Sequence, residues 1–238
     1  KTDELVGQLE LSNGILRDLA HQMIVWNGDK STVASLETLV RKSLTPQARL
    51  QALCALDGLG EVKVDTLLTA LGDEQPAIRR HAIRLSEPLL GRSAQISDAV
   101  LKHAEESDPT IRLQLAYSLG EWNEEAAALA LAKIAIASQN DPYIIAAVMS
   151  SLNKENVGPV LAAVMGGSRK QPPPERLVER LLAVATALGD NYAMVKAVST
   201  ITQAKDGKFA AWQFTALAGM LDVTARRKQS LDQKLDDK

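Results

Sequence analysis

Apolar residues recur at spacings of three and four along most of the chain, which is the pattern of helices that bury one face. The clearest case follows Pro109, where Ile111, Leu115 and Leu119 share one side. An aspartate or threonine before a proline favours a helix start, because the first residue caps the helix and proline has no N–H to leave unpaired. The pattern predicts helices in pairs joined by short turns: 15–26 with 32–43, 46–58 with 62–71, 76–89 with 95–106, 109–120 with 124–138, 142–152 with 157–166, and 175–189 with 191–203.

These pairs repeat with a period just over 30 residues. Successive prolines at the helix starts are 30, 33 and 33 residues apart, and arginines three residues behind them follow the same drifting period. A fifth segment keeps Asp141-Pro142 but has Ile145 where the arginine belongs. A single pair of this length has too little core to fold, whereas stacked pairs bury a continuous one. We therefore predict an all-α fold, an α-solenoid of HEAT or armadillo type, with these structural repeat positions: Pro46, Pro76, Pro109, Pro142, Arg17, Arg49, Arg79 and Arg112.

The expected organisation is one solenoid of about six helix pairs over residues 1–223. Leu5, Leu9 and Leu11 fit the second helix of a preceding unit, and 208–222 begins a further one. The Gly- and Pro-rich stretch 166–174 predicts a loop, because it cannot continue a helix. Residues 224–238 alternate in charge and predict a solvated tail or a truncated helix. Since the chain begins with Lys1 and no signal-like segment follows, we expect a piece of a longer protein.

Composition and charge narrow the function classes. Lys plus Arg (27) nearly balances Asp plus Glu (29), and a net charge of −2 is a poor match for a phosphate backbone. The longest apolar stretch, 126–137, contains Lys133 and is too short to cross a bilayer. The single cysteine, Cys54, can form neither an internal disulfide nor a haem attachment, and its apolar flanks predict a core residue. These features exclude direct membrane insertion and argue against nucleic-acid binding.

The spacing Pro-x-x-Arg-x-x-Ala resembles the HEAT-like repeat family, also called PBS-lyase-type HEAT repeats. Segments such as Leu16-Arg-Asp-Leu-Ala20, Ala48-Arg-Leu-Gln-Ala-Leu53 and Ala211-Trp-Gln-Phe-Thr-Ala-Leu-Ala-Gly219 are similar to a stretch of bacterial putative membrane-bound dehydrogenases. The resemblance implies a place between a quinoprotein-like β-propeller and a cytochrome c module in an exported, periplasmic and membrane-associated parent. Haem c and a quinone would then lie elsewhere in that parent, and we expect no cofactor in this segment.

The repeat arginines have two interpretations. They could form a cationic row for an anionic partner. Alternatively, each guanidinium bonds carbonyls and an acidic residue of a neighbouring unit. We favour the structural interpretation and expect the acids to be Asp57, Glu87 or Glu121.

Other candidate sites are weaker. The basic cluster around Arg79, Arg80 and Arg84 is balanced by nearby acids and predicts a mixed solvated surface. Three histidines come from different units and lack a carboxylate at metal-ligand spacing. Tryptophans are expected to cover the edges between repeats, although a rim near the turns could instead contact a partner. The residues concerned are His21, His81 and His103 for the histidines, Trp26, Trp122 and Trp212 for the tryptophans, and Trp122 with Tyr143 for the partner contact.

The function expected from these observations is a non-catalytic scaffold or protein-interaction module. The partner would be a protein, either another domain of the parent or a separate chain. The alternatives are a HEAT-repeat protein that binds nucleic acid, which requires a continuous basic face, and an enzyme, which requires clustered carboxylates or histidines in a pocket.

Overall fold

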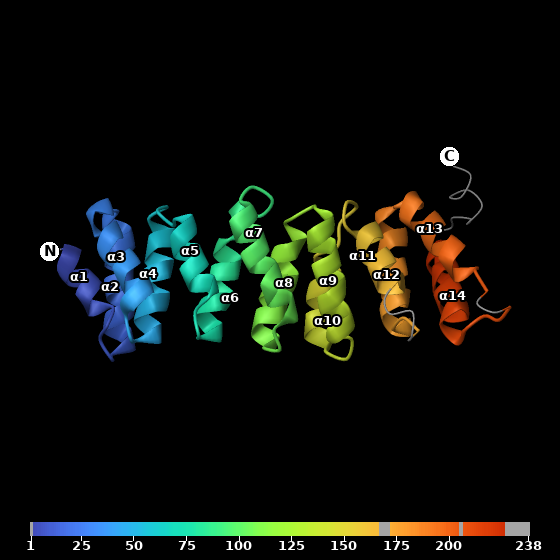
Figure 1. Ribbon diagram of the computed structural model, residues 1–238, viewed down its shortest axis with the longest axis horizontal. Helices are drawn as coiled ribbons and strands as arrows, with labels where there is room; N and C mark the ends of the chain where they lie inside the picture. Colours follow the sequence, from blue (N-terminus) through green and yellow to red (C-terminus); the bar gives the residue numbers. More distant parts are fainter. Residues whose placement is uncertain (1, 167–171, 205–206, 227–238) are drawn as a thin grey trace. The chain divides into compact units, whose positions relative to one another are not determined.

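The computed structural model describes residues 2–166, 172–204 and 207–226, and these fold into helices without a β-strand (Figure 1). Contacts divide the chain into two compact units, 1–115 and 116–238, with the boundary inside α8. The first unit contains α1 (Thr2–Gln8), α2 (Gly14–Asn27), α3 (Val33–Lys42), α4 (Pro46–Gly58), α5 (Val64–Leu71), α6 (Pro76–Leu85), α7 (Ala94–Leu101) and the start of α8 (Pro109–Gly120). The second contains α9 (Glu125–Ala137), α10 (Pro142–Ser150), α11 (Val157–Gly166), α12 (Glu175–Leu188), α13 (Asn191–Ile201) and α14 (Ala211–Arg226).

Proline begins the first helix of four successive repeats, as predicted: α4, α6, α8 and α10 each start at their proline. In α10 the preceding Asp141 caps the helix, and its carboxylate accepts hydrogen bonds from the N–H groups of Tyr143 (2.9 Å) and Ile144 (3.1 Å). Asp108 accepts from the N–H groups of Thr110 and Ile111 in the same way, whereas Thr45 makes no side-chain cap hydrogen bond at the start of α4. The proline therefore marks all four helix starts, and the side-chain cap is confirmed for the two aspartates.

The predicted helix 76–89 is too long. α6 ends at Leu85, and Glu87–Leu89 forms a 3₁₀ turn instead. Pro88 explains the difference, because it has no N–H to continue the hydrogen-bond ladder and its ring clashes with the preceding turn. Ser86 is buried at the break, where its hydroxyl donates to the Ala82 carbonyl at 2.7 Å.

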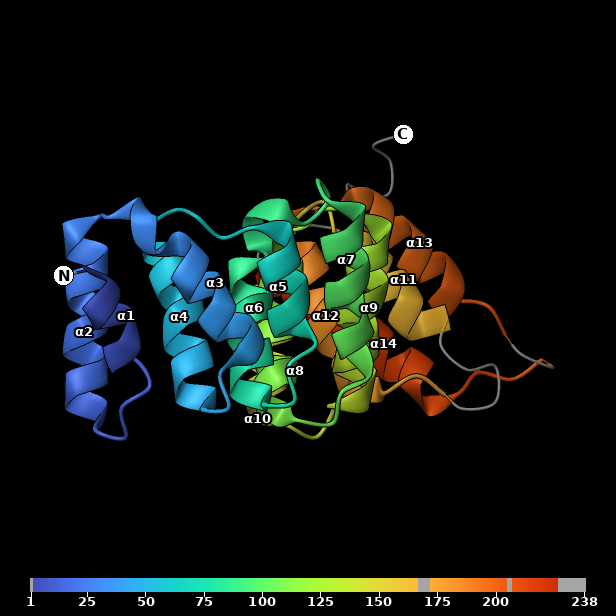
Figure 2. The same ribbon diagram turned by 60° about the vertical axis from the view of Figure 1, so that its left-hand side comes forward.

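Helices of equivalent position lie against one another within each unit. In the first unit, α2, α4 and α6 contact in succession and so do α3, α5 and α7 (Figure 2). In the second, α12 contacts both α10 and α14, while α11 contacts both α9 and α13. The core between the rows is aliphatic, and its fully buried members include Leu36, Leu53, Leu56, Leu67, Ile83, Leu131, Val160 and Leu181. The fold is an all-helical solenoid, as the sequence predicts.

Two predictions fall partly outside the described residues. For the loop 166–174, residues 167–171 lie outside, while Gly166 ends α11 and 172–174 lead into α12. For the tail 224–238, α14 continues to Arg226 and residues 227–238 lie outside. The division at residue 223 stays a prediction.

Candidate functional site

The repeat arginines join neighbouring repeats of the first unit. Arg49 of α4 donates to both carboxylate oxygens of Asp73, from Nε at 2.7 Å and from Nη2 at 2.9 Å, and its Nη1 donates to the Ser43 carbonyl at 2.9 Å. Asp73 lies in the turn between α5 and α6, so the pair ties α4 to the start of the next repeat. Both side chains are buried, at 9% and 8% exposure. A paired, fully hydrogen-bonded guanidinium is the form in which arginine is tolerated in an interior.

The next repeat copies this arrangement. Arg79 of α6 donates from Nε (2.9 Å) and Nη2 (2.7 Å) to the two carboxylate oxygens of Glu106, which precedes α8. Its Nη1 donates to the backbone carbonyl of Asp73 at 2.8 Å. Arg112 of α8 in turn donates to the carbonyl of Glu106 at 2.5 Å. Each acid thus takes one arginine on its carboxylate and the next arginine on its carbonyl.

We call this connected set the arginine ladder; it consists of Arg49, Asp73, Arg79, Glu106 and Arg112. Its guanidinium groups face protein atoms, which is the structural interpretation of the arginine series. Arg49 and Arg79 bond Asp73 and Glu106, and neither of these is among the acids expected from the sequence. Asp57 lies on α4, with its Oδ2 3.7 Å from Arg84 Nη2, whereas the acids of the ladder lie six residues before the next repeat arginine.

The arginine series changes at both ends. Arg17 donates to the carbonyls of Leu11 (2.7 Å) and Ser12 (3.0 Å), and Ser43 stands where an acid would follow it. At the other end Ile145 is buried at 2% exposure. The turn that would supply its acid, 166–174, has neither aspartate nor glutamate in its sequence. Aliphatic packing replaces the ion pair at this repeat.

The ladder lowers the pKa of both its acids. Burial alone would raise the pKa of Asp73, but hydrogen bonds from Arg49 and the Gln75 N–H, with the charge of Arg49, lower it below its ordinary value. Burial would also raise the pKa of Glu106, but hydrogen bonds from Arg79 and His103 lower it below its ordinary value. Both carboxylates are therefore held in the charged form in the folded chain.

This arrangement predicts acid sensitivity. A carboxylate with a depressed folded pKa contributes its full stability above its unfolded pKa, about 4, and loses it as the pH falls through the folded value. We expect the free energy of unfolding to fall as the pH drops below about 4. In Asp73→Asn the stability is lower at pH 7 and the acid slope is shallower, which urea melts across this range measure. Parallel pH profiles for the two proteins would contradict the assignment.

The remaining polar candidates do not gather into a metal-binding cluster in the part of the chain that the structure describes. No group of three or more His, Cys, Asp or Glu side chains is placed there to hold a metal ion. His103 is buried with its Nδ1 2.5 Å from a Glu106 oxygen, and His81 lies beside Arg80. Burial and the neighbouring Arg80 and Arg84 lower the pKa of His81. Cys54 is half-buried, and burial raises the pKa of its thiol, which favours the unreactive protonated form.

The aromatic candidates lie in different environments. Trp122 is only 5% exposed, so it packs in the interior of its unit and presents no surface to a partner. Trp26, at the end of α2, is 79% exposed, and Trp212 is half-buried in α14. Tyr143, at the start of α10, is 77% exposed and stays a candidate contact.

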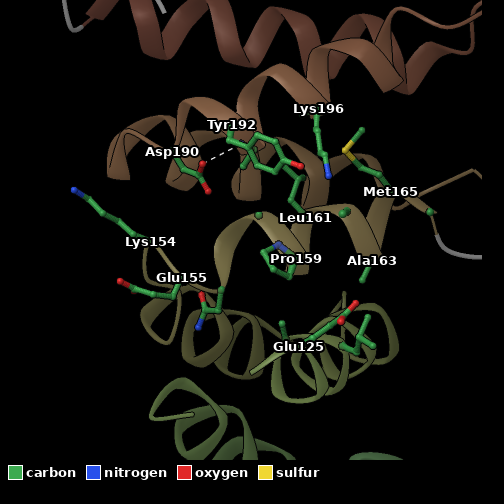
Figure 3. A pocket seen from close by; sticks show the side chains of 18 of the residues that line it. Glu125, Lys154, Glu155, Pro159, Leu161, Ala163, Met165, Asp190, Tyr192 and Lys196 are labelled. Carbon is green, nitrogen blue, oxygen red and sulfur yellow. Dashed lines mark hydrogen bonds between the residues drawn. The ribbon is translucent and has the colours of Figure 1, made fainter. Parts of the chain in front are cut away.

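A groove that the sequence did not predict crosses α9, α11 and α13 in the second unit. It has a volume of about 900 Å³. Its floor is made of small and aliphatic side chains that are buried or nearly so, among them Ala128, Leu161, Ala193 and Ala197. Figure 3 shows Tyr192 and Lys196 along α13, facing Pro159 and Leu161 of α11. The groove therefore has an apolar floor and is formed by the second helices of three repeats.

The helices α11 and α13 pack closely at one end of this groove. A Cβ at Gly158 of α11 would meet Ala193 Cβ and Asp190 Oδ2 of the α13 start, each at 3.2 Å. Asn153 fixes the turn before α11, since its side-chain amide donates to Asn123 Oδ1 at 3.0 Å and its Oδ1 accepts from the Asn156 N–H at 3.0 Å. The rim is thus built from turns that are bonded across repeats.

Charge on the lining is unequal. The groove lining contains two lysines, Lys154 and Lys196, and four acids, Glu124, Glu125, Glu155 and Asp190. Lys196 Nζ lies 4.5 Å from the centre of the Tyr192 ring, a cation–π contact. Among the described residues, none of the three glutamates forms an ion pair. The groove offers exposed carboxylates around an apolar floor, which suits a segment with basic and apolar side chains.

None of the helices in the described part of the chain is both long enough and apolar enough to cross a bilayer. A sequence search of curated proteins found no match to the chain. Residues 64–153, from α5 through the end of α10, match the family model of HEAT repeats. The ladder residues Asp73, Arg79, Glu106 and Arg112 and three of the four helix-starting prolines lie within this match. Residues 64–153 are therefore a HEAT-like repeat region.

Proposed function

We propose that this chain is a non-catalytic protein-interaction module and that it binds a protein segment in the groove across α9, α11 and α13. The observation that carries the proposal is the combination of an apolar floor with glutamates at the rim that form no ion pair with any described residue. HEAT-type repeats offer extended surfaces of stacked helices for such contacts. The expected ligand is a segment of another protein with lysine or arginine at one end and aliphatic or aromatic side chains along the rest.

The apolar part of the groove provides the affinity in this proposal. Leu129 of α9 and Tyr192 of α13 are large, exposed side chains on opposite walls, and the small residues between them leave space for a partner side chain. Aromatic and aliphatic anchors in a desolvated pocket dominate most protein interfaces. The carboxylates add orientation and speed of association more than affinity.

The test is a selection of random peptides displayed on phage against the purified chain. We expect the enriched peptides to combine basic and apolar residues and to bind Ala162→Trp at least tenfold more weakly, because the new indole fills the groove. The matched control is Ala77→Trp, an equally exposed alanine on α6 outside the groove, which leaves binding unchanged. Peptides that bind Ala162→Trp as well as the unmodified chain would refute the groove.

The charge of the rim is tested separately. Replacing both Glu125 and Glu155 by lysine reverses the excess of acid at the groove. We expect the selected peptides to lose at least tenfold in affinity and to recover it when their basic residues are replaced by glutamate. If the lysine variant binds the selected peptides as tightly as the unmodified chain does, and the glutamate peptides bind it no more tightly, the proposed ligand has no basic end.

The setting we propose for this module is a larger dehydrogenase-like protein with a cytochrome c module. The support is the sequence resemblance of segments such as Leu16-Arg-Asp-Leu-Ala20 and the 211–219 stretch. In such a parent the ligand segment would come from a neighbouring domain or a separate partner protein. The flanking coding sequence tests this setting, since it should encode a β-propeller before the module and a CxxCH haem motif after it.

A further inference from the structure

Helix α2 carries an apolar face that no described residue covers. Five large side chains on this helix are exposed. Leu16, which is among the least accessible of them, is still 46% exposed. No charged residue interrupts them on that side. The five are Ile15, Leu16, Leu19, Met23 and Trp26. A solvent-exposed face of this size on a single helix is typical of a contact surface.

The register of the repeats identifies what this face is for. In α4, the residues two and nine positions after the repeat arginine meet the preceding first helix. Gln51 donates to Asp18 of α2 at 2.8 Å, and a Cβ on Gly58 would lie 2.7 Å from Val25 of α2. In α2 the residues two and nine positions after Arg17 are Leu19 and Trp26.

Two further repeat positions support the same assignment of the α2 face. In α10 the residue six after the repeat position is Ser151, and it abuts Gly120 of the preceding first helix, α8. Its counterpart in α2 is Met23. The residue just before each repeat arginine is buried in later repeats, with Ala48, Ile78 and Ile111 at 0%, 1% and 0% exposure, whereas Leu16 is open. The exposed face of α2 is therefore the one that elsewhere packs on the first helix of the previous repeat.

Helix α1 supports the same assignment. It contacts α2 and α3, as α3 contacts α4 and α5, so it occupies the place of a second helix (Figure 2). A second helix in this fold is paired with a first helix, and α1 has no such partner among the described residues. We propose that the face of α2 binds the first helix of one more HEAT-type repeat, placed N-terminal to α1 in the same polypeptide.

The chemistry of the face specifies that helix. At the repeat positions where α4 has Gln51, Ala55 and Gly58, α2 has leucine, methionine and tryptophan. The space between stacked helices is fixed at about 8–10 Å. The added helix must therefore present alanine or glycine, rather than a large or charged residue, at the position eight after its own repeat site. Gly120 of α8 is such a residue, eight positions after Arg112.

The test extends the chain by a helix of this type. One extended chain carries a copy of residues 108–124, which contain α8 and its turn, ahead of Lys1. A second carries a copy of 45–61, which contain α4, with the copied Asp57 replaced by glycine so that it has a small residue at the required position. We expect at least one extension to raise the melting temperature by about 5 °C or more and to slow peroxide oxidation of Met23 at least fivefold, read by mass spectrometry. Oxidation of Met165, on α11, serves as the internal control and keeps its rate.

Leu19→Glu supplies the matched variant. In the unextended chain it shifts the melting temperature by less than about 2 °C, because the side chain is already half exposed. In the extended chain it abolishes the gain in melting temperature and restores the rate of Met23 oxidation. Two extensions that leave the Met23 rate unchanged would overturn the proposal. A concentration-dependent dimer of the unextended chain that Leu19→Glu dissociates would also overturn it, since the face would then bind a second copy.

Discussion

Replacing Arg49 by alanine lowers the free energy of unfolding by about 3 kcal/mol, the loss expected when one member of a buried ion pair is removed. The substitution strips Asp73 of two hydrogen bonds and leaves its carboxylate at 8% exposure with only the Gln75 N–H at 2.8 Å. It also frees the Ser43 carbonyl, which accepts from Arg49 at 2.9 Å. Urea melts at pH 7 measure the change.

The control is Arg92→Ala, which removes an exposed arginine of the same unit and should change stability by less than about 0.5 kcal/mol. The double variant Arg49→Ala/Asp73→Ala should cost less than the sum of the two single variants, because the second substitution removes the charge that the first leaves unpaired. Additive losses, or an unchanged midpoint for Arg49→Ala, would refute the ladder as a connection between repeats.

Replacing Gly120 by valine destabilises the second unit by about 3 kcal/mol, at the upper end of the cost of overpacking. A Cβ at this position would lie 2.7 Å from Ser151 Cβ, 3.0 Å from its Cα and 3.1 Å from its carbonyl oxygen. Because two of these atoms belong to the backbone of α10 or its end, a side-chain rotation cannot relieve the clash. Thermal or urea melts report the loss.

Gly7→Ala is the matched control for this substitution. Gly7 lies in α1 and a Cβ there meets nothing within 4 Å. Alanine is the better helix former, so the change should leave stability equal or raise it by up to about 1 kcal/mol. If the Gly120→Val protein is as stable as the unmodified chain, α8 and α10 can move apart, contrary to the close packing described above.

The sequence predicted the helices and their pairing because each depends on local chemistry. Proline and its capping neighbour determine where α4, α6, α8 and α10 begin, and the three–four spacing of apolar residues follows from the helix itself. Two helix ends were misjudged: the predicted helices 76–89 and 95–106 run past Leu85 and Leu101, where α6 and α7 end and 3₁₀ turns follow. The apolar pattern continues past both ends, and it does not register that Pro88 cannot donate a backbone hydrogen bond. Local signals were sufficient for the fold class.

The acids that pair with the repeat arginines were harder to predict, because each of these ion pairs joins two neighbouring repeats. Asp73 and Glu106 were missed, and Asp57, Glu87 and Glu121 were expected instead. A usable signal exists, because both acids lie six residues before the next repeat arginine. Trp122 looked like a rim residue from its place near a turn, but its burial depends on packing that sequence spacing does not reveal. The groove was missed for the same reason, because its floor is alanine and leucine in ordinary helical register.

The groove, and not the arginine series, is the proposed binding surface. Hydrogen–deuterium exchange of the chain with and without a selected peptide distinguishes the two surfaces. We expect slower exchange in 125–137, 157–166 and 191–201, with unchanged exchange in 46–58 and 76–85. Protection centred on the helices that carry Arg49 and Arg79, with none in the three groove helices, would contradict it.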